Sequence, residues 1–257
     1  MISIIIPTLN EAENIAPLLE RLLRCEPPAD EIIFVDDGST DGTRDRIRAF
    51  AGQATVRLIE REAPAFGLSG AVIAGAHAAT GDWLVVMDAD LSHPPEKIGE
   101  LLRPLLEGRA DMVIGSRYVK GGSTPGWPLW RKVLSRIAAG VAYPITGVQD
   151  SMGGFFAMPR KLLLELTPAA TGFKIAFEAL AHGGRNLRVV EVPIVFRDRT
   201  RGASKMSLGV ALIFALRWIA AMARRLFRGQ PTPARFRHQS SIPSPAKSSK
   251  AANNVLP

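Results

Sequence analysis

The sequence predicts an α/β fold in which a mainly parallel sheet is flanked by helices. Two patterns in the first half of the chain predict it. Short β-rich runs alternate there with helix-patterned segments, which is typical of β-α-β units. The β-rich runs are also almost continuously apolar, as expected of strands that helices cover on both faces. In such a sheet, ligands bind beyond the carboxyl ends of the strands.

Five strands and four helices are predicted before residue 115, in alternating order. The first strand is an Ile-rich run near the start of the chain, and the later strands are apolar runs of similar length. The segments between them show helix-like spacing of their apolar residues. Strands are expected at residues 2–6, 31–35, 55–59, 83–87 and 112–114. Helices are expected at residues 11–24, 41–50, 68–79 and 95–107.

The pattern changes after residue 120. A Gly- and Pro-rich loop at residues 121–128 precedes a predicted helix with an apolar stripe on one side. The stripe fits a surface helix packed on the sheet and a membrane-facing helix equally well. It consists of Trp130, Val133, Leu134, Ile137, Ala138 and Val141, opposite Arg131, Lys132, Ser135 and Arg136. Two more strand-like runs, at residues 154–157 and 188–196, flank a helical stretch at 174–181.

Charge is distributed unevenly along the 257 residues, which carry a formal net charge of +8. Residues 197–257 contain twelve Lys or Arg residues and one acid, Asp198, whereas residues 1–196 are mildly acidic. On charge alone, the basic end fits nucleic acid or an anionic membrane surface. The single cysteine, Cys25, excludes an internal disulfide and a zinc site built on several thiolates, and it predicts a reducing compartment.

The C-terminal part predicts membrane association without a membrane span. No signal peptide is expected, and the most apolar stretch, residues 208–223, is interrupted by Arg217 and is shorter than the roughly 20 apolar residues of a span. Three arginines at helical spacing predict an amphipathic helix over residues 207–228 that lies on a membrane; a terminal helix buried against the sheet is the alternative. Residues 229–257 are predicted to be a disordered basic tail.

Polar and acidic clusters follow three of the predicted strands, at residues 7–11, 36–39 and 88–90. Asp and Asn also cap helices, but parallel strands bring all three clusters to one edge of the sheet. Asp88 and Asp90 are two residues apart in extended backbone, so both side chains point the same way. Two adjacent carboxylates repel each other unless a hard divalent cation binds them, which predicts a Mg²⁺ or Mn²⁺ site.

These motifs resemble those of the inverting family 2 glycosyltransferases of the GT-A fold, within the group of dolichyl- and polyprenyl-phosphate mannosyltransferases. The resemblance covers residues 1–228 and keeps the family order. Its segments are residues 7–11, 35–42, 67–75, 88–96, 115–118, 150–157, 172–178 and 199–205. It implies a Rossmann-like catalytic domain over residues 1–206, with a nucleotide-sugar half at about 1–118 and an acceptor half at about 119–206.

The resemblance also implies roles for individual residues. The positions that it matches to nucleotide-sugar binding are Pro7, Glu11, Val35, Asp37, Asp88, Ala89, Lys174 and Arg199. Asp88, Asp90 and Ser92 match the metal-binding motif, in which the family often has Gln at the position of Ser92. The family also often has Tyr where this chain has Leu9, which leaves stacking on the base and the nucleotide open. Matched to the acceptor phosphate are Arg117, Arg131, Ser135, Arg199 and Lys205, and Asp90, Arg117 and Lys205 are expected to be catalytic.

No catalytic base stands out, because the four histidines are scattered and His93 is expected to support the acidic loop. A phosphate monoester is largely ionised at neutral pH and can attack without losing a proton to the protein. Glu178 and Asp150 are candidate bases if the acceptor is an alcohol. Gly202 and Ser204 favour a phosphate-binding loop at residues 199–205 over an ordinary solvated loop.

The predicted function is transfer of mannose from GDP-mannose to a polyprenyl (dolichyl-type) monophosphate, with inversion and a divalent metal. The expected partners are these two substrates, the cytoplasmic face of a membrane, on which the protein is peripheral, and a separate membrane subunit. Two alternatives stay open: transfer of glucose or N-acetylglucosamine from a UDP-sugar, and a non-catalytic nucleotide- or nucleic-acid-binding protein. Nucleic acid is disfavoured because the basic tail lacks interleaved aromatic residues.

Overall fold

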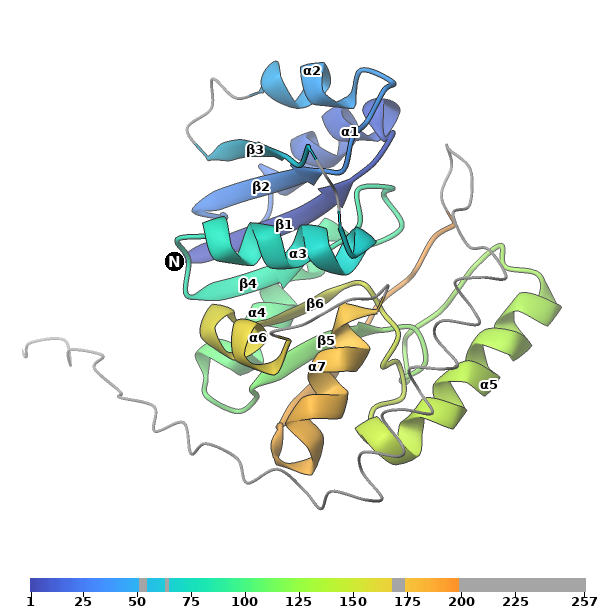
Figure 1. Cartoon of the computed structure of the whole chain (residues 1–257). Helices are drawn as coiled ribbons and strands as arrows, with labels where there is room; N and C mark the ends of the chain where they lie inside the picture. Colours follow the sequence, from blue (N-terminus) through green and yellow to red (C-terminus); the bar gives the residue numbers. More distant parts are fainter. Residues whose placement is uncertain (51–54, 63–64, 168–173, 199–257) are drawn as a thin grey trace, which may run out of the picture.

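A seven-stranded sheet forms the centre of the molecule, as seen in the computed structural model (Figure 1), which describes residues 1–50, 55–62, 65–167 and 174–198. The strand order is β3-β2-β1-β4-β6-β5-β7. All neighbouring strands are parallel except β6, which runs antiparallel to both β4 and β5. The strands are β1 Ile2–Thr8, β2 Glu31–Asp36, β3 Val56–Glu60, β4 Trp83–Val86, β5 Met112–Ser116, β6 Phe156–Pro159 and β7 Val189–Pro193.

Helices cover both faces of the sheet and bury two separate apolar clusters. On one face, α1, α2 and α4 pack on alternate strand residues such as Ile4 and Phe34. On the other face, α3, α6 and α7 pack on the intervening residues, such as Ile5 and Val35. The helices are α1 Ala12–Leu22, α2 Thr43–Arg48, α3 Gly67–Ala78, α4 Ile98–Leu106, α5 Leu129–Thr146, α6 Arg160–Leu166 and α7 Ile175–Gly183, with short 3-10 helices η1 Pro95–Lys97 and η2 Gly184–Asn186.

This architecture confirms the predicted α/β class and the mainly parallel sheet. Each strand and helix predicted within the described residues is present within a few residues of its expected bounds. Two features were not predicted from the sequence: the short helix α6 and the antiparallel direction of β6. The predicted amphipathic helix at residues 207–228 and the tail at 229–257 lie outside the described residues.

Helix α5 stands apart from the sheet and contacts α7 and η2 instead (Figure 1). Its apolar stripe faces outward, with Trp130 68% exposed and Ile137 58% exposed. Its other side, which includes the buried residues Ala139 and Ala142, faces the protein. The alternative in which this stripe packs on the sheet is therefore wrong. None of the described helices is long and apolar enough to cross a membrane.

Candidate functional site

The carboxyl ends of β1, β2 and β4 lie at one edge of the sheet, because β1 pairs in parallel with both of its neighbours. Three residues other than glycine have a left-handed backbone in the described part of the chain, and each follows the end of one of the strands β1, β3 and β4. They are Asn10, Phe66 and Leu91, with φ of 55°, 66° and 62°. Such backbone is unfavourable for L-residues and concentrates at functional sites. The edge predicted to hold the ligand is thus also where the described backbone is most strained.

Two adjacent aspartates after β2 have different roles. Asp36 is completely buried and accepts hydrogen bonds from the backbone N–H groups of Gly38 and Ser39. Burial alone raises the pKa of Asp36, but hydrogen bonds from the Ser39 hydroxyl, from Arg44 and from the Ser39 backbone N–H outweigh burial and lower the pKa. Asp36 therefore fixes the loop. Asp37, the predicted nucleotide-binding residue, accepts a hydrogen bond from Arg61 at 2.8 Å.

The other predicted nucleotide-binding residues lie beside Asp37. Pro7 of β1 is in register with Val35 of β2. The Val35 side chain is fully buried on the α3 side of the sheet, so that only its main chain is placed to meet a ligand. Glu11 precedes α1, and its carboxylate accepts a hydrogen bond from Asn14 at 2.8 Å. The backbone N–H of Glu11 donates to the Thr43 hydroxyl.

The acidic motif follows β4 and is suited to a divalent cation. The Asp88 side chain is 34% exposed, and Asp90 is buried and accepts the backbone N–H of Ser92 at 3.1 Å. The Ser92 hydroxyl is also buried, yet it has no hydrogen-bond partner among the described residues, and Ala89 lies buried between the aspartates. Unpaired buried oxygens need a partner, and hard cations prefer oxygen ligands.

These residues fit a Mg²⁺ or Mn²⁺ ion that has some ligands from the protein and others from a bound substrate. Among the described residues, no group of three or more His, Cys, Asp or Glu side chains could hold a metal by itself. Mg²⁺ usually takes one or two carboxylates and completes its shell with water and substrate phosphates. Asp88, Asp90 and the Ser92 hydroxyl would hold such an ion, and its remaining positions would be open to a diphosphate.

His93 and Gly154 hold Asp88 in place. The Nδ1 atom of His93 accepts the backbone N–H of Asp88 at 3.1 Å, which requires the neutral tautomer with its proton on Nε2. Burial lowers the pKa of His93, although the nearby charge of Asp88 opposes this change. The imidazole also stacks on Phe155, with ring centroids 5.3 Å apart. A Cβ atom on Gly154 would lie 3.1 Å from the Asp88 carboxylate, so only glycine leaves the present space.

Arg117 follows β5 and forms a bidentate ion pair with the fully buried Asp150, through Nε at 2.8 Å and Nη2 at 2.7 Å. Burial opposes the charge of Arg117, but the bond to Asp150 outweighs it and raises the pKa of the guanidinium. Glu191 of β7 in turn accepts the backbone N–H groups of Gln149 and Asp150. Both Asp150 oxygens are thus engaged, which argues against the sequence-based option of Asp150 as a catalytic base.

Aromatic rings surround the two arginines predicted to bind the acceptor. The Arg117 guanidinium lies 5.6 Å from the ring centre of Trp127, and that of Arg131 lies 3.9 Å from the same ring. Arg131 also pairs with Asp198 at 2.7 Å. Ser135, one turn further along α5, lies 2.5 Å from the Tyr118 hydroxyl. The structure therefore brings Arg117, Arg131 and Ser135 into one neighbourhood, as predicted.

Lys174 joins the acidic motif to this neighbourhood. Its ammonium donates to the carbonyl of Met152 at 3.1 Å. Burial, and next the positive charge of Arg117, lower the pKa of Lys174, whereas the charges of Asp88 and Asp150 raise it. The Lys174 ammonium therefore lies within electrostatic range of Arg117, Asp88 and Asp150. Arg199 and Lys205, the other predicted cations, lie outside the described residues.

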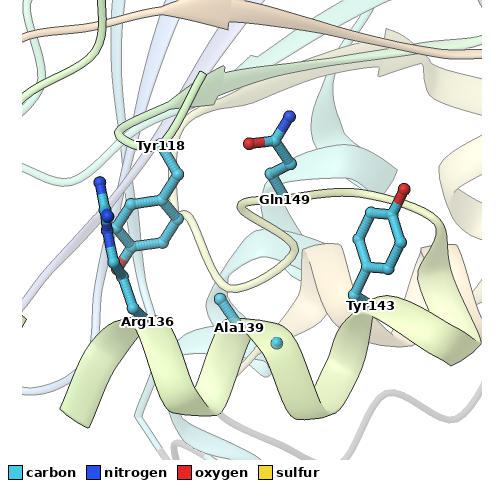
Figure 2. Close-up of a pocket in the computed structure, with 6 residues that line it drawn as sticks. Tyr118, Arg136, Ala139, Tyr143 and Gln149 are labelled. Carbon is cyan, nitrogen blue, oxygen red and sulfur yellow. The ribbon is translucent and has the colours of Figure 1, made fainter. Parts of the chain in front are cut away.

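A cavity of about 280 Å³ opens between α5 and the loop that follows it. Figure 2 shows Tyr118 and Arg136 together at one end of this cavity and Tyr143 at the other, with Gln149 between them. Because Tyr118 adjoins Arg117 in the chain and bonds to Ser135, the cavity lies next to the predicted acceptor site and away from the acidic motif.

Several site residues were missed by sequence reasoning. Arg61, Trp127 and Glu191 carry no local motif, because each acts on a partner that is distant in the chain. A signal existed only for Gly154, since a glycine next to a strand indicates close backbone approach.

The comparisons with known proteins agree with this geometry. A model of the family described as glycosyl transferase family 2 matches residues 3–167. The chain belongs to this family. The family assignment accounts for the parallel sheet with an acidic motif at its ligand edge, and it confirms the resemblance noted from the motifs.

Characterised family 2 members resemble the chain over most of its length. It is 42% identical to a dolichol-phosphate mannosyltransferase of Pyrococcus furiosus, covering 80% of this chain and 59% of that protein. It is also 42% identical to the dolichol-phosphate mannosyltransferase of Saccharomyces cerevisiae, covering 80% of each. The polyprenol monophosphomannose synthase of Mycolicibacterium smegmatis is 39% identical, covering 79% of this chain and 80% of that protein.

Solved structures of a family 2-like fold superpose well. Glucosyl-3-phosphoglycerate synthase from Mycobacterium tuberculosis, in complex with Mn²⁺, UDP-glucose and phosphoglyceric acid, gives a TM-score of 0.67 at 25% identity, covering 90% of this chain and 81% of that chain. A complex of the same enzyme with Mg²⁺ and UDP also gives 0.67 at 25% identity, covering 90% of this chain and 80% of that chain. The chain therefore has the GT-A fold.

Proposed function

We propose that this protein transfers mannose from GDP-mannose to a polyprenyl monophosphate of the dolichyl type. The observation that carries the proposal is that one site combines two parts for handling phosphate. Asp88 and Asp90 suit a metal-bound diphosphate, and Arg117 and Lys174 supply positive charge beside them. The names of the relatives support mannose as the sugar and a lipid phosphate as the acceptor.

The donor lies at the carboxyl edge of β1, β2 and β4 in this proposal. Pro7, Glu11, Val35 and Asp37 hold the nucleoside, with Arg61 fixing the Asp37 carboxylate. Asp88, Asp90 and Ser92 would hold Mg²⁺ or Mn²⁺, which would supply positive charge to the departing diphosphate. Lys174 adds its ammonium on the same side, and the buried Ala89 lies between the two aspartates in the chain.

The reaction is a single displacement. An ionised oxygen of the lipid phosphate forms a bond to the anomeric carbon, the bond from that carbon to the nucleoside diphosphate breaks, and the configuration inverts. Arg117 and Arg131 hold the attacking phosphate, with Ser135, Arg199 and Lys205 as further ligands. No proton has to leave the acceptor, because a phosphate monoester is largely ionised at neutral pH. This agrees with the structure, in which neither Asp150 nor His93 is placed as a base. Both Asp150 oxygens accept hydrogen bonds from Arg117, and the Nδ1 atom of His93 accepts the backbone N–H of Asp88.

The acceptor is a membrane lipid, and α5 connects its phosphate site to the membrane. Arg131 and Ser135 lie on the protein side of α5, whereas Trp130, Leu134 and Ile137 are exposed on the other side. An exposed apolar helix face with basic neighbours is typical of helices that lie in a membrane interface. The protein is accordingly peripheral, on the cytoplasmic face, and a separate membrane subunit could also contact this helix.

The donor is tested by offering labelled GDP-mannose, UDP-glucose and UDP-N-acetylglucosamine separately with polyprenyl phosphate and Mg²⁺ or Mn²⁺. Label from GDP-mannose is expected in the organic phase, and EDTA is expected to stop the transfer. Asp90→Ala should nearly abolish turnover. Transfer from none of the three donors, or full activity of Asp90→Ala, would overturn the proposal.

A UDP-sugar donor is the second candidate. The absence of the Tyr that the family often has at Leu9 leaves the base contact open, and the superposed glucosyl-3-phosphoglycerate synthase was solved with UDP-glucose. Label from UDP-glucose or UDP-N-acetylglucosamine in the organic phase, in place of mannose, would establish this candidate.

A further inference from the structure

Trp127 has a buried hydrogen-bond donor without an acceptor. The residue is 7% exposed, and its indole Nε1 is closed to water and has no hydrogen-bond partner in the described part of the structure. The indole N–H can only donate. Buried polar groups are nearly always paired, so an unpaired donor at a functional site indicates a partner that arrives with a ligand.

The surroundings of Trp127 indicate that this partner is an anion. Arg117 and Arg131 lie 5.6 and 3.9 Å from its ring centre, so two guanidinium groups flank the same indole. The ion pair with Asp150 uses Nε and Nη2 of Arg117, and the ion pair with Asp198 uses Nη1 of Arg131. Both arginines retain further N–H groups beyond these bonds.

The place of Trp127 in the chain adds a second reason. It stands two residues before the first residue of α5, a helix of 18 residues. The backbone N–H groups of the first helical turn and the helix dipole favour negative charge at this end. Arg131 lies within that first turn. Trp127 thus lies beside two guanidinium groups and shortly before a helix N-terminus.

We propose that the indole Nε1–H of Trp127 donates a hydrogen bond to a phosphate oxygen of the acceptor, between Arg117 and Arg131. This inference rests on the proposed function, because it takes the acceptor to be a phosphate monoester. The nitrogen is closed to water in the present structure, so a side chain must move when the anion binds. We expect Arg131 to be the side chain that moves, because its positive charge attracts an incoming anion. It lies over the Trp127 ring and is held by an ion pair with the half-exposed Asp198.

The kinetic test compares two matched substitutions. Trp127→Phe keeps an aromatic ring beside both arginines but removes the N–H, whereas Trp83→Phe makes the same change at the first residue of β4, at the end of the strand opposite the acidic motif. Trp127→Phe should raise the KM for polyprenyl phosphate about tenfold, as expected for a lost bond to a charged group, and leave the KM for GDP-mannose unchanged. Trp83→Phe should change neither KM. An unchanged acceptor KM in Trp127→Phe would overturn the inference.

A spectroscopic test uses the indole N–H itself. The chain has four tryptophans, so ¹⁵N-labelled protein gives few indole resonances, which the two Phe variants assign. A short-chain polyprenyl phosphate should shift the Trp127 resonance downfield, and the matching alcohol should not. A shift with inorganic phosphate alone would show that the phosphate group suffices without the lipid. No shift with the short-chain polyprenyl phosphate would overturn the inference.

The two failures are distinguishable. Wild-type protein that transfers no sugar to polyprenyl phosphate contradicts the proposed function. Wild-type protein that transfers mannose, together with a Trp127→Phe variant of unchanged acceptor KM, contradicts only the role of Trp127.

Discussion

Single residues that carry no charge position the charged groups of this site. The peptide N–H of Asp88 bonds to His93, and the backbone of Gly154 leaves room for the Asp88 carboxylate. Trp127 similarly flanks Arg117 and Arg131 without an ion pair of its own. Catalytic placement therefore depends on close packing as much as on charge.

Gly154→Ala tests the packing around Asp88. The new Cβ would lie 3.1 Å from Asp88 Oδ2 and 3.3 Å from the His93 ring, so the carboxylate must move. We expect kcat/KM for the donor to fall about tenfold or more, since small displacements of reacting groups have large effects on rate. Gly153→Ala is the matched control, because its Cβ would meet only ordinary contacts from 3.4 Å outward. Steady-state kinetics of both variants check this, and equal activities would contradict it.

The pairs between arginine and aspartate side chains also explain why the sequence could not reveal the roles of some site residues. Asp36 and Asp37 are adjacent acids after one strand, and nothing local shows that Asp36 is buried against Arg44 whereas Asp37 meets Arg61. Nor does the local sequence show that Asp150, a candidate base, forms an ion pair with Arg117. Asp37 and Arg61, like Asp150 and Arg117, are more than twenty residues apart in the chain, so these two pairs depend on the fold and not on local sequence.

At the scale of secondary-structure elements, the two ends of β2 are secured differently. Its carboxyl end carries Asp36 and the ligand edge. Its first residue, Glu31, bonds to Ser3, Thr80 and Arg57, and so joins three segments at the opposite edge. Burial by itself raises the pKa of Glu31, but these hydrogen bonds outweigh burial and lower the pKa to about 2.

Glu31→Gln should change the pH dependence of stability. A carboxylate with a lowered folded-state pKa stabilises the fold above its unfolded value near 4.5, and this contribution is lost as the pH falls towards 2. The shift corresponds to about 3 kcal/mol. We expect the free energy of unfolding of the wild type to fall more steeply than that of Glu31→Gln between these pH values. Urea unfolding at several pH values measures this free energy, and Glu20→Gln, a substitution at an exposed glutamate, is the control. The same pH dependence for the wild type and Glu31→Gln would contradict a lowered pKa of Glu31.

Substitutions on the exposed side of helix α5 test whether this helix contacts the membrane. Its exposed side includes Leu134 and Ile137, at 57% and 58% exposure. Replacing both by Glu should leave the fold stable, since neither side chain is buried, but should reduce binding to lipid vesicles about tenfold or more. Vesicle sedimentation measures binding. Replacing the exposed Leu106 of α4 by Glu is the control, and equal binding by all three proteins would contradict membrane contact through α5.

The orientation of α5 shows what an element pattern can and cannot predict. The spacing of its apolar residues predicted the helix and its stripe, but not whether the stripe faces the protein. The strands were predictable because β1, β2 and β4 are buried on both faces and read as apolar runs. The antiparallel direction of β6 was not, because apolar spacing is the same for either direction.

At the scale of the whole molecule, charge is separated along the chain. Residues 229–257 contain four Lys or Arg residues and no Asp or Glu. Each basic residue near an anionic membrane contributes about 1 kcal/mol to binding at low salt. Deleting residues 229–257 should therefore weaken binding to anionic vesicles and make it less sensitive to salt, while transfer to detergent-solubilised acceptor is unchanged. Vesicle binding at several salt concentrations checks this, and identical salt curves would argue against it.

In the proposed function, Asp88 and Asp90 hold the donor diphosphate through a divalent cation, so GDP binding measured by calorimetry should depend on that cation. With Mn²⁺ present, wild-type protein should bind GDP at least about tenfold more tightly than in EDTA, and Asp90→Ala should lose this difference. Tight GDP binding in EDTA, or the same Mn²⁺ effect in Asp90→Ala, would contradict the claim.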